Sequence, residues 1–218
     1  MAKATLTISS KNNSSWSLRG WLLTRMSGLE FGEELVPIDD PANRAELLLL
    51  SPSVLVPKLS HEGVTVWDTL AIGAYLNEIR PAVGLLPADR AARARCRSIC
   101  GEMHSGFSNL GSALPMNLKG SHAGFKLWSG AKADIDRIVA IWRDCVSTWQ
   151  GPDFFGSRPC MADAMSAPVV TRFLTYDVAL DAGCDAYAER IMAPPDMVAR
   201  VEAAKAEPDE IREPAVEF

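Results

Sequence analysis

The sequence predicts an α/β domain followed by an all-α domain, and three features of the 218-residue chain indicate it. A short β-branched run, an apolar helix and a second short apolar run alternate near the N-terminus, which is typical of a βαβ unit. Two further strand-like runs flank a turn at His61-Glu62-Gly63. From residue 88 onward no stretch alternates like a strand, and apolar side chains recur at helical spacing instead.

The first eighty residues predict the element order β-α-β-α-β-β-α. The first helix has Ser15 near its start and ends at Gly28, and the strands on either side of it pair in parallel. The last two strands are joined by the turn at 61–63. We expect strands at 4–8, 31–38, 54–60 and 63–67, and helices at 15–27, 42–50 and from Thr69 to about Ile79.

A connection at 80–87, punctuated by proline and glycine, is the best domain boundary and separates a domain at 1–80 from one at 88–218. The second domain begins with one long helix from Asp89 to about Leu114, interrupted by small residues around Gly101 and Ser105-Gly106. Further helices are expected at 133–149, 161–176, 185–192 and 196–205.

Composition excludes several classes of function. Hydrophobic residues make up 48% and charged residues 22% of the chain, as in ordinary soluble globular proteins. The net charge of −5, without a Lys/Arg cluster, predicts no nucleic-acid partner. No apolar run approaches the length of a membrane span, and the N-terminus has no apolar signal core. Five cysteines without a close-spaced framework predict reduced thiols, so we expect a cytoplasmic protein with no membrane association.

The most informative segment runs from Val54 to Leu59 and is followed by Asp68-Thr69 at the start of a helix. A proline between two strands cannot donate to a sheet, so Pro57 marks an edge or a bend and leaves the backbone of Val56 free to pair with a ligand. The Asp-Thr pair opens a helix whose N-terminus favours an anion. Together they suit a small, extended, charged peptide, although an edge strand and a capped helix without a ligand would show the same residues.

These segments resemble the thioredoxin-like half of the cytosolic glutathione S-transferase family. There a cis Val-Pro step pairs with the cysteinyl part of glutathione, and a following acidic-hydroxyl pair holds its γ-glutamyl end. The segment Asn13-Ser14-Ser15-Trp16-Ser17-Leu18-Arg19 is similar to that of the zeta (maleylacetoacetate isomerase-like) class, with Trp16 in place of a cysteine. The resemblance covers nearly the whole chain and implies a bacterial member nearest that class, with a thioredoxin-like domain followed by an all-helical glutathione transferase C-terminal domain.

By this resemblance, Ser14 or Ser15 activates the glutathione thiol, with Ser14 the first candidate. A free thiol has a pKa of about 8.5, and lowering it by two units requires roughly 2.7 kcal/mol. One good hydrogen bond to a charged acceptor supplies roughly 1.5–3 kcal/mol, so a single well-placed serine is nearly enough. A Ser-Ser pair by itself would more often be a helix cap.

The resemblance also implies the residues that bind glutathione. Val56 offers its backbone to the cysteinyl unit and Pro57 fixes the bend, while Thr69 binds the γ-glutamyl carboxylate and Asp68 holds its ammonium group. Many relatives carry Lys or Gln just before Val-Pro to reach the glycine carboxylate, and here that position is Leu55. Arg44 is the candidate replacement.

The long helix of the second domain is expected to line the pocket for the second substrate. The pocket candidates, in chain order, are Trp16, Met103, His104 and Phe107. Leu110 and Met116-Asn117 extend the apolar wall, and Glu102 or His104 can orient a polar group or act as a base, although Met and Phe at this spacing are usually core. Cys96 and Cys100 share a helix face but lack a second ligand pair, so no metal site is expected.

A second motif of the family, a capping motif that starts a buried helix of the second domain, falls at Cys160 to Asp163. Cysteine takes the place of the usual Ser/Thr, and Asp163 is expected to hold the preceding loop. We interpret this motif as a folding element without chemistry.

The sequence therefore predicts an enzyme, a glutathione transferase that activates the glutathione thiolate for conjugation to, or isomerisation of, a small electrophile. Glutathione is the co-substrate, the family implies a homodimer, and detoxification and a dedicated catabolic step both remain open. A non-catalytic, glutathione transferase-like binding protein is the alternative that Leu55 and Trp16 would fit. A thiol oxidoreductase is disfavoured because no cysteine stands at the start of the first helix.

Overall fold

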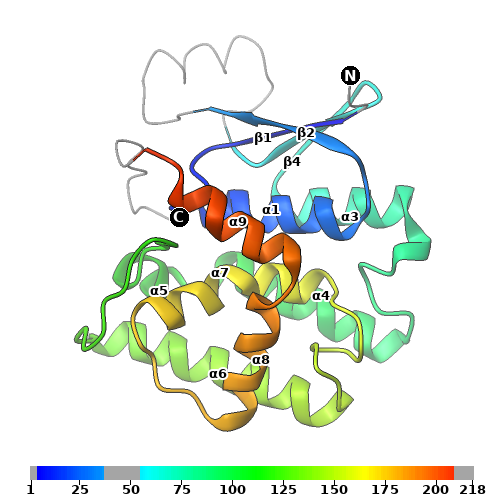
Figure 1. Ribbon diagram of the computed structural model, residues 1–218. Helices are drawn as coiled ribbons and strands as arrows, with labels where there is room; N and C mark the ends of the chain where they lie inside the picture. The colour runs from blue at the N-terminus through cyan, green and yellow to red at the C-terminus, as the bar shows by residue number, and fades with distance from the viewer. Residues whose placement is uncertain (1–3, 37–54, 209–218) are drawn as a thin grey trace.

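The computed structural model describes residues 4–36 and 55–208. A four-stranded sheet lies at one end of the molecule, two helices cover one of its faces, and a group of helices packs beneath them (Figure 1). The sheet has the order β2-β1-β3-β4 and is formed by β1 (Ala4–Ile8), β2 (Phe31–Leu35), β3 (Lys58–His61) and β4 (Val64–Trp67). β1 pairs in parallel with β2 and antiparallel with β3, and β3 pairs antiparallel with β4.

The predicted order of elements in the first part of the chain is confirmed where the structure describes it. α1 (Ser15–Met26) begins after Ser14, whose hydroxyl oxygen accepts from the Ser17 N–H at 3.3 Å, and Gly28 follows its end with φ 68°. α3 (Thr69–Ile79) begins after Asp68 as expected. The predicted helix at 42–50, the last residues of the predicted 31–38 strand and Val54 lie outside the described residues.

Some predicted boundaries differ from the observed ones. The strand expected from residue 54 begins at Lys58, because the Val56–Pro57 bond is cis and the chain enters the sheet only after this bend. The helix expected from Asp89 is interrupted at Gly106 as predicted, giving α4 (Arg90–Ser105) and α5 (Ser108–Ala113), whereas the interruption expected at Gly101 is absent. At Phe107 the backbone leaves the helical region with φ −121° and ψ 48°.

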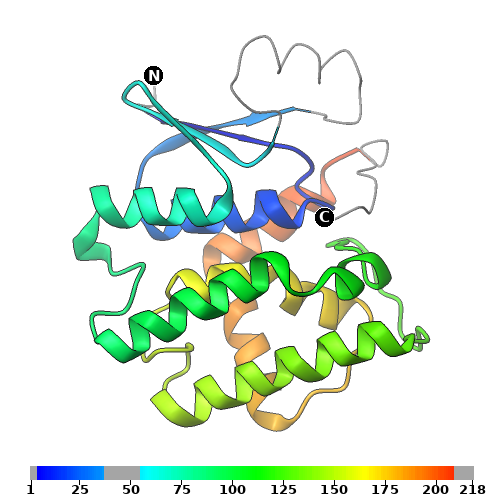
Figure 2. The ribbon, with the colours of Figure 1, turned by 180° about the vertical axis from the view of Figure 1, so that it is seen from behind.

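The remaining helices form the lower part of the molecule. A short 3₁₀ turn at Pro81–Val83 lies in the connection that leads the chain from the end of α3 into α4, seen from behind in Figure 2. Asp181 caps the helix that was expected from residue 185, so that helix starts three residues earlier. The helices are α6 (Ser129–Trp149), α7 (Met161–Thr175), α8 (Ala182–Met192) and α9 (Pro195–Lys205).

The helix that carries the candidate serines is fixed on several sides. α1 packs against α3, α7 and α9, and its buried Leu18, Trp21 and Leu23 join the apolar interior. Gly20 is required for this packing, because a Cβ there would lie 2.4 Å from Cγ of Pro57. The close approach brings the Pro57 ring directly against the middle of α1.

Asp163 holds the start of α7, as the sequence predicted. Its Oδ2 accepts from the Cys160 N–H at 2.7 Å, and its Oδ1 accepts from the Phe154 N–H at 3.2 Å and the Tyr187 hydroxyl at 3.1 Å. Burial raises the pKa of the carboxyl to about 6, because desolvation outweighs the hydrogen bonds that favour its charged form.

This raised pKa predicts a pH-dependent difference in stability between the wild type and Asp163→Asn. The folded state binds the proton more tightly than the unfolded state, so the stabilisation due to Asp163 is complete below pH 4 and declines as the pH rises to about 6. We expect the free energy of unfolding of the wild type, relative to the variant, to fall by roughly 1–3 kcal/mol from pH 4 to pH 7. Urea titrations at four pH values measure it. The exposed Asp177→Asn is the control, and a pH-independent difference for Asp163→Asn contradicts the prediction.

Candidate active site

The predicted serines lie buried at the N-terminus of α1. Ser14 is 4% exposed and caps the helix, and Ser15 is 1% exposed with its hydroxyl oxygen accepting from Nη1 of Arg19 at 3.4 Å. Ser17 has a different role, because its Oγ accepts from the Ser9 N–H at 3.1 Å and so ties α1 to the end of β1. Both candidate hydroxyls therefore lie at the positive dipole end of α1, where an anion is stabilised.

The Val56–Pro57 step lies next to this helix. Its peptide bond is cis, Pro57 is buried against Gly20, and Val56 is half-buried. Val56 precedes β3 and takes no part in the strand pairings of the described sheet. Its backbone is therefore placed where an extended ligand can pair with it, while the side chain of the preceding Leu55 is exposed.

Asp68 and Thr69 form the start of α3 in an unusual conformation. Asp68 has φ 73° and ψ 136°, outside the regions that non-glycine residues normally occupy. Its Oδ1 accepts from the N–H groups of Leu70 at 2.8 Å and Ala71 at 3.2 Å, and its Oδ2 contacts Nε2 of His104 at 2.5 Å. These contacts, two from its own helix and one from α4, hold the strained backbone in place.

The Thr69 hydroxyl is the unsatisfied group of this site. The residue is 1% exposed, and its Oγ1 has no hydrogen-bond partner within the described part of the chain. A buried hydroxyl without a partner costs about 1–3 kcal/mol. Such a hydroxyl beside a helix N-terminus is suited to a ligand that supplies the missing hydrogen-bond acceptor or donor.

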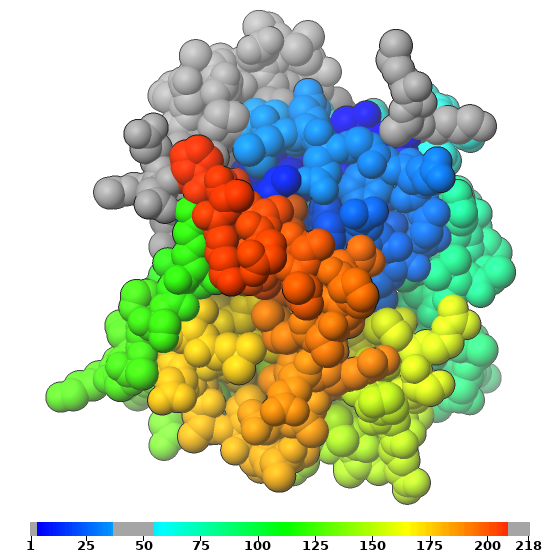
Figure 3. All heavy atoms as spheres, viewed as in Figure 1, coloured from blue at the N-terminus to red at the C-terminus, as the bar shows by residue number. Residues whose placement is uncertain are grey.

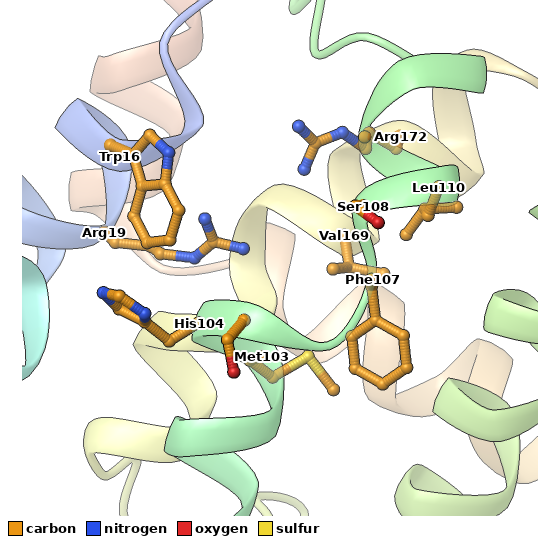
Figure 4. A pocket seen from close by; sticks show the side chains of 11 residues that line it. Trp16, Arg19, Met103, His104, Phe107, Ser108, Leu110, Val169 and Arg172 are labelled. Atoms are coloured by element: carbon orange, nitrogen blue, oxygen red, sulfur yellow. The ribbon is translucent and has the colours of Figure 1, made fainter. Parts of the chain in front are cut away.

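A small pocket opens beside the two helix starts (Figure 4). The four predicted pocket residues, Trp16, Met103, His104 and Phe107, line it. The centroids of the Trp16 and His104 rings lie 4.8 Å apart. The guanidinium carbon of Arg19 lies 4.6 Å from the centroid of the Trp16 ring. His104 thus contacts Trp16, the residue after Ser15, on one side and Asp68 on the other.

Two buried arginines, Arg19 and Arg172, give the pocket a positive wall. Nε of Arg19 donates to the Met165 carbonyl at 2.9 Å, and Nε of Arg172 donates to the Leu114 carbonyl at 2.8 Å. Figure 4 shows that both guanidinium groups point toward the middle of the pocket. Arg172 stands in α7, which is almost wholly buried, and Arg19 is itself only 3% exposed. The rest of the pocket lining is formed by Ser105, Ser108, Leu110, Gly111 and Val169.

Some predicted site residues lie elsewhere. Arg44 falls outside the described residues. Glu102, expected as an alternative to His104, instead accepts two hydrogen bonds from Arg137 at 2.6 and 2.8 Å at the surface. Met116, expected in the apolar wall, packs against Leu18 and Met197 instead.

The cysteines give no reactive site. All five are free and buried, and burial raises the pKa of Cys145 to about 12 and of Cys184 to about 11. The pKa of Cys160 is also raised, first by its contact with Cys96 and then by burial. A thiol oxidoreductase needs an accessible thiolate, which this arrangement opposes. Among the described residues, no group of three or more His, Cys, Asp or Glu side chains could hold a metal ion.

None of the described helices combines the length and apolar character needed to cross a membrane.

Sequence comparison relates the chain to known proteins. Residues 13–79 match the family model for the glutathione S-transferase N-terminal domain. The maleylacetoacetate isomerase of Rattus norvegicus is 30% identical over 175 residues, which is 78% of this chain and 78% of that protein. The maleylacetoacetate isomerase of Rhizobium meliloti (strain 1021) is 33% identical over 156 residues, or 67% of this chain and 72% of that protein.

Solved structures show the same fold. A glutathione transferase homolog from Burkholderia, crystallised with bound glutathione, has a TM-score of 0.72 at 23% identity, covering 94% of this chain and 99% of that one. The glutathione S-transferase 1-6 of Anopheles dirus species B also gives a TM-score of 0.72, at 18% identity, covering 93% of this chain and 95% of that one.

Proposed function

Because the chain belongs to the glutathione S-transferase family and is zeta-like, we propose that it stabilises the glutathione thiolate at the start of α1 and presents it to a small electrophile in the adjoining pocket. The protein is a glutathione transferase, with glutathione as co-substrate. The thiolate either remains attached to the electrophile, which is conjugation, or adds and leaves again, which is isomerisation.

The observation that carries this proposal is the meeting of two helix N-termini at His104. His104 bonds Asp68 at the start of α3 and lies against Trp16 at the start of α1, with the two rings tilted, and it lines the pocket itself. A charged tripeptide that reaches from one helix start to the other therefore ends beside the pocket. Binding both reactants in such contact removes much of the entropic barrier to a bimolecular reaction.

The residue roles follow from this placement. A hydroxyl of Ser14 or Ser15 donates to the thiolate, and the backbone of Val56 pairs with the cysteinyl unit at the bend made by Pro57. Thr69 binds the γ-glutamyl carboxylate and Asp68 its ammonium group, while Arg44 remains the candidate for the glycine carboxylate. Residues 1–80 then form the glutathione-binding domain, and residues 88–218 supply most of the wall for the second substrate.

The test is a titration of the purified protein with glutathione, followed by the ultraviolet absorbance of the thiolate as a function of pH. We expect bound glutathione to ionise about two pH units below the free thiol, and to react with a panel of Michael acceptors and aryl halides. If glutathione does not bind, or binds with an unchanged thiol pKa, the proposal fails. Thiolate formation without turnover of any electrophile would favour the non-catalytic binding protein.

The two arginines of the pocket support a finer proposal, that the second substrate is an anionic electrophile. Arg19 and Arg172 both line the pocket, and charged hydrogen bonds from a guanidinium to a carboxylate are strong, particularly when they are shielded from water.

Arg172→Met will raise the KM for a carboxylate-bearing enone roughly 10–100-fold, because the variant loses a charged hydrogen bond of about 1.5–3 kcal/mol. The KM for a neutral aryl halide will change by less than about threefold. Steady-state kinetics with both electrophiles measure the ratio. Arg172→Lys keeps the charge and is the matched control, and an equal loss for both electrophiles contradicts an anionic substrate.

We further propose a cytoplasmic homodimer that acts on electrophiles for detoxification. Exposed apolar side chains on β4 and α3, namely Val64, Trp67 and Ile79, support association through this part of the surface. Light scattering at micromolar concentration tests the dimer, and a mass of one chain would contradict it.

A further inference from the structure

The loop from β1 into α1 is held by a carboxylate from the far end of the chain. Glu207, two residues beyond α9, is 8% exposed. Its Oε2 accepts from the Ser10 hydroxyl at 2.7 Å and from the Asn12 N–H at 3.0 Å, and its Oε1 accepts from the Lys11 N–H at 2.8 Å. The buried side chain of Glu207 thus accepts hydrogen bonds from three consecutive residues of the loop that leads to the candidate serines.

The same loop has a second support. The Leu118 N–H donates to the Asn12 carbonyl at 3.3 Å, and the Lys119 N–H donates to Oδ1 of Asn12 at 3.1 Å. The Lys119 ammonium group also donates to the carbonyl of Glu207 at 2.5 Å. Figure 1 shows the end of α9 beside the start of α1, and Figure 3 shows the same end packed against the N-terminal part of the chain at the surface.

The hydrogen bonds of Glu207 continue through Ser10 into the helix start. Oγ of Ser10 accepts from the N–H groups of Asn12 at 3.1 Å and Asn13 at 3.0 Å while it donates to Glu207. The next residue is Ser14, whose extended backbone, with φ −87° and ψ 103°, is the conformation that a capping residue needs. The position of the Ser14 and Ser15 hydroxyls therefore depends on where the loop before them is held.

We propose that Glu207 is a positioning residue for the activating serine, an inference that rests on the proposed function. A hydrogen bond weakens steeply when its distance or angle departs from the optimum. When the carboxylate is removed, the Lys11 N–H and the Ser10 hydroxyl lose their acceptor, and the loop shifts so that they reach other acceptors. The serine then donates poorly to the thiolate, and the pKa of bound glutathione rises.

Docking of α9 does not depend on Glu207. Met197 of α9 is buried against Leu18 and Met116, and Asp196 forms an ion pair with Arg25 at 3.6 Å. Arg200 of α9 is also buried, with its guanidinium over the Trp21 ring. A variant at Glu207 thus keeps the helix in place and alters mainly the loop.

The test compares Glu207→Gln with the wild type in the thiolate titration and in steady-state kinetics. We expect the midpoint of thiolate formation to rise by about one pH unit and kcat at neutral pH to fall about tenfold, with KM for the electrophile within twofold. Glu207→Asp restores the charge and is expected to recover part of the loss. Glu202→Gln, on the exposed face of α9 beside Lys205, is the matched control and leaves the midpoint unchanged.

Ser10→Ala removes the same link from the other side and keeps the inference testable if Glu207→Gln does not fold. It is expected to shift the midpoint in the same direction. A wild-type midpoint well below that of free glutathione, together with an unchanged midpoint in a folded Glu207 or Ser10 variant, overturns the positioning role alone. A wild type that leaves the thiol pKa unchanged overturns the proposed function and this inference with it. A role in stability alone would lower the melting temperature without moving the midpoint.

Discussion

Replacing Ser14 with alanine will raise the pKa of the bound glutathione thiol by about one to two units and lower kcat/KM at neutral pH roughly 10–100-fold. The physical reason is the loss of one hydrogen bond to a charged acceptor, worth about 1.5–3 kcal/mol, where 1.36 kcal/mol corresponds to one pKa unit. Ser14 accepts from the Ser17 N–H, which leaves its own proton available for the thiolate. Thiolate absorbance as a function of pH measures the shift directly.

The same substitution also removes the cap of α1, so stability and catalysis must be separated. Loss of an N-cap costs about 0.5–2 kcal/mol of stability, which a urea titration measures independently. Ser17→Ala is the matched control, since Ser17 stands in the same first turn of α1 but its hydroxyl is engaged with Ser9. If Ser15→Ala shifts the thiol pKa and Ser14→Ala does not, Ser15 is the activating residue. If neither variant shifts it, a serine-activated thiolate is wrong.

Replacing Thr69 with valine will weaken glutathione binding roughly 10–100-fold and leave the unliganded protein as stable as the wild type, or more stable by about 1 kcal/mol. Valine has nearly the same shape and removes the buried Oγ1 that has no partner in the described structure. A hydrogen bond to a carboxylate contributes about 1.5–3 kcal/mol, whereas an unpaired buried hydroxyl destabilises the fold that contains it. The two effects therefore have opposite signs in the bound and free protein.

Isothermal titration calorimetry measures the affinity, and thermal unfolding without glutathione measures the stability. Thr69→Ser is the control, because it keeps the hydroxyl and removes only the methyl group of the side chain. A valine variant that binds glutathione as the wild type does would show that Oγ1 does not touch the ligand. A clear loss of stability in the free valine variant would show that a water or an unseen partner already satisfies the hydroxyl.

The sequence alone was enough for the local parts of this site. Val56-Pro57 determined a bend before a strand because proline cannot donate to a sheet, and Asp68-Thr69 determined a helix start because a short acidic side chain satisfies the first free N–H groups. The serines at 14 and 15 were placed correctly at the start of α1 for the same reason. Each of these depends on neighbours within a few residues, and such contacts can be read along the chain.

Local patterns failed where two signals competed. Gly101 and Gly106 both predicted a break in the long helix, and only Gly106 provides one, since α4 is continuous from Arg90 to Ser105. The strand predicted from residue 54 was wrong for a related reason, since its β-branched residues do not reveal where the bend ends and sheet pairing begins.

Only the tertiary structure decided the contacts between segments that are distant in the sequence. His104 reaches Asp68 across 36 residues, Arg19 reaches Met165 across 146, and Glu207 reaches Ser10 across 197. A single histidine, arginine or glutamate carries no local pattern that names its partner, because its role depends on which helices pack together. The sequence by itself thus determined the family, the helix starts and the Val-Pro bend, whereas packing decided which charges surround the pocket and what holds the serine loop.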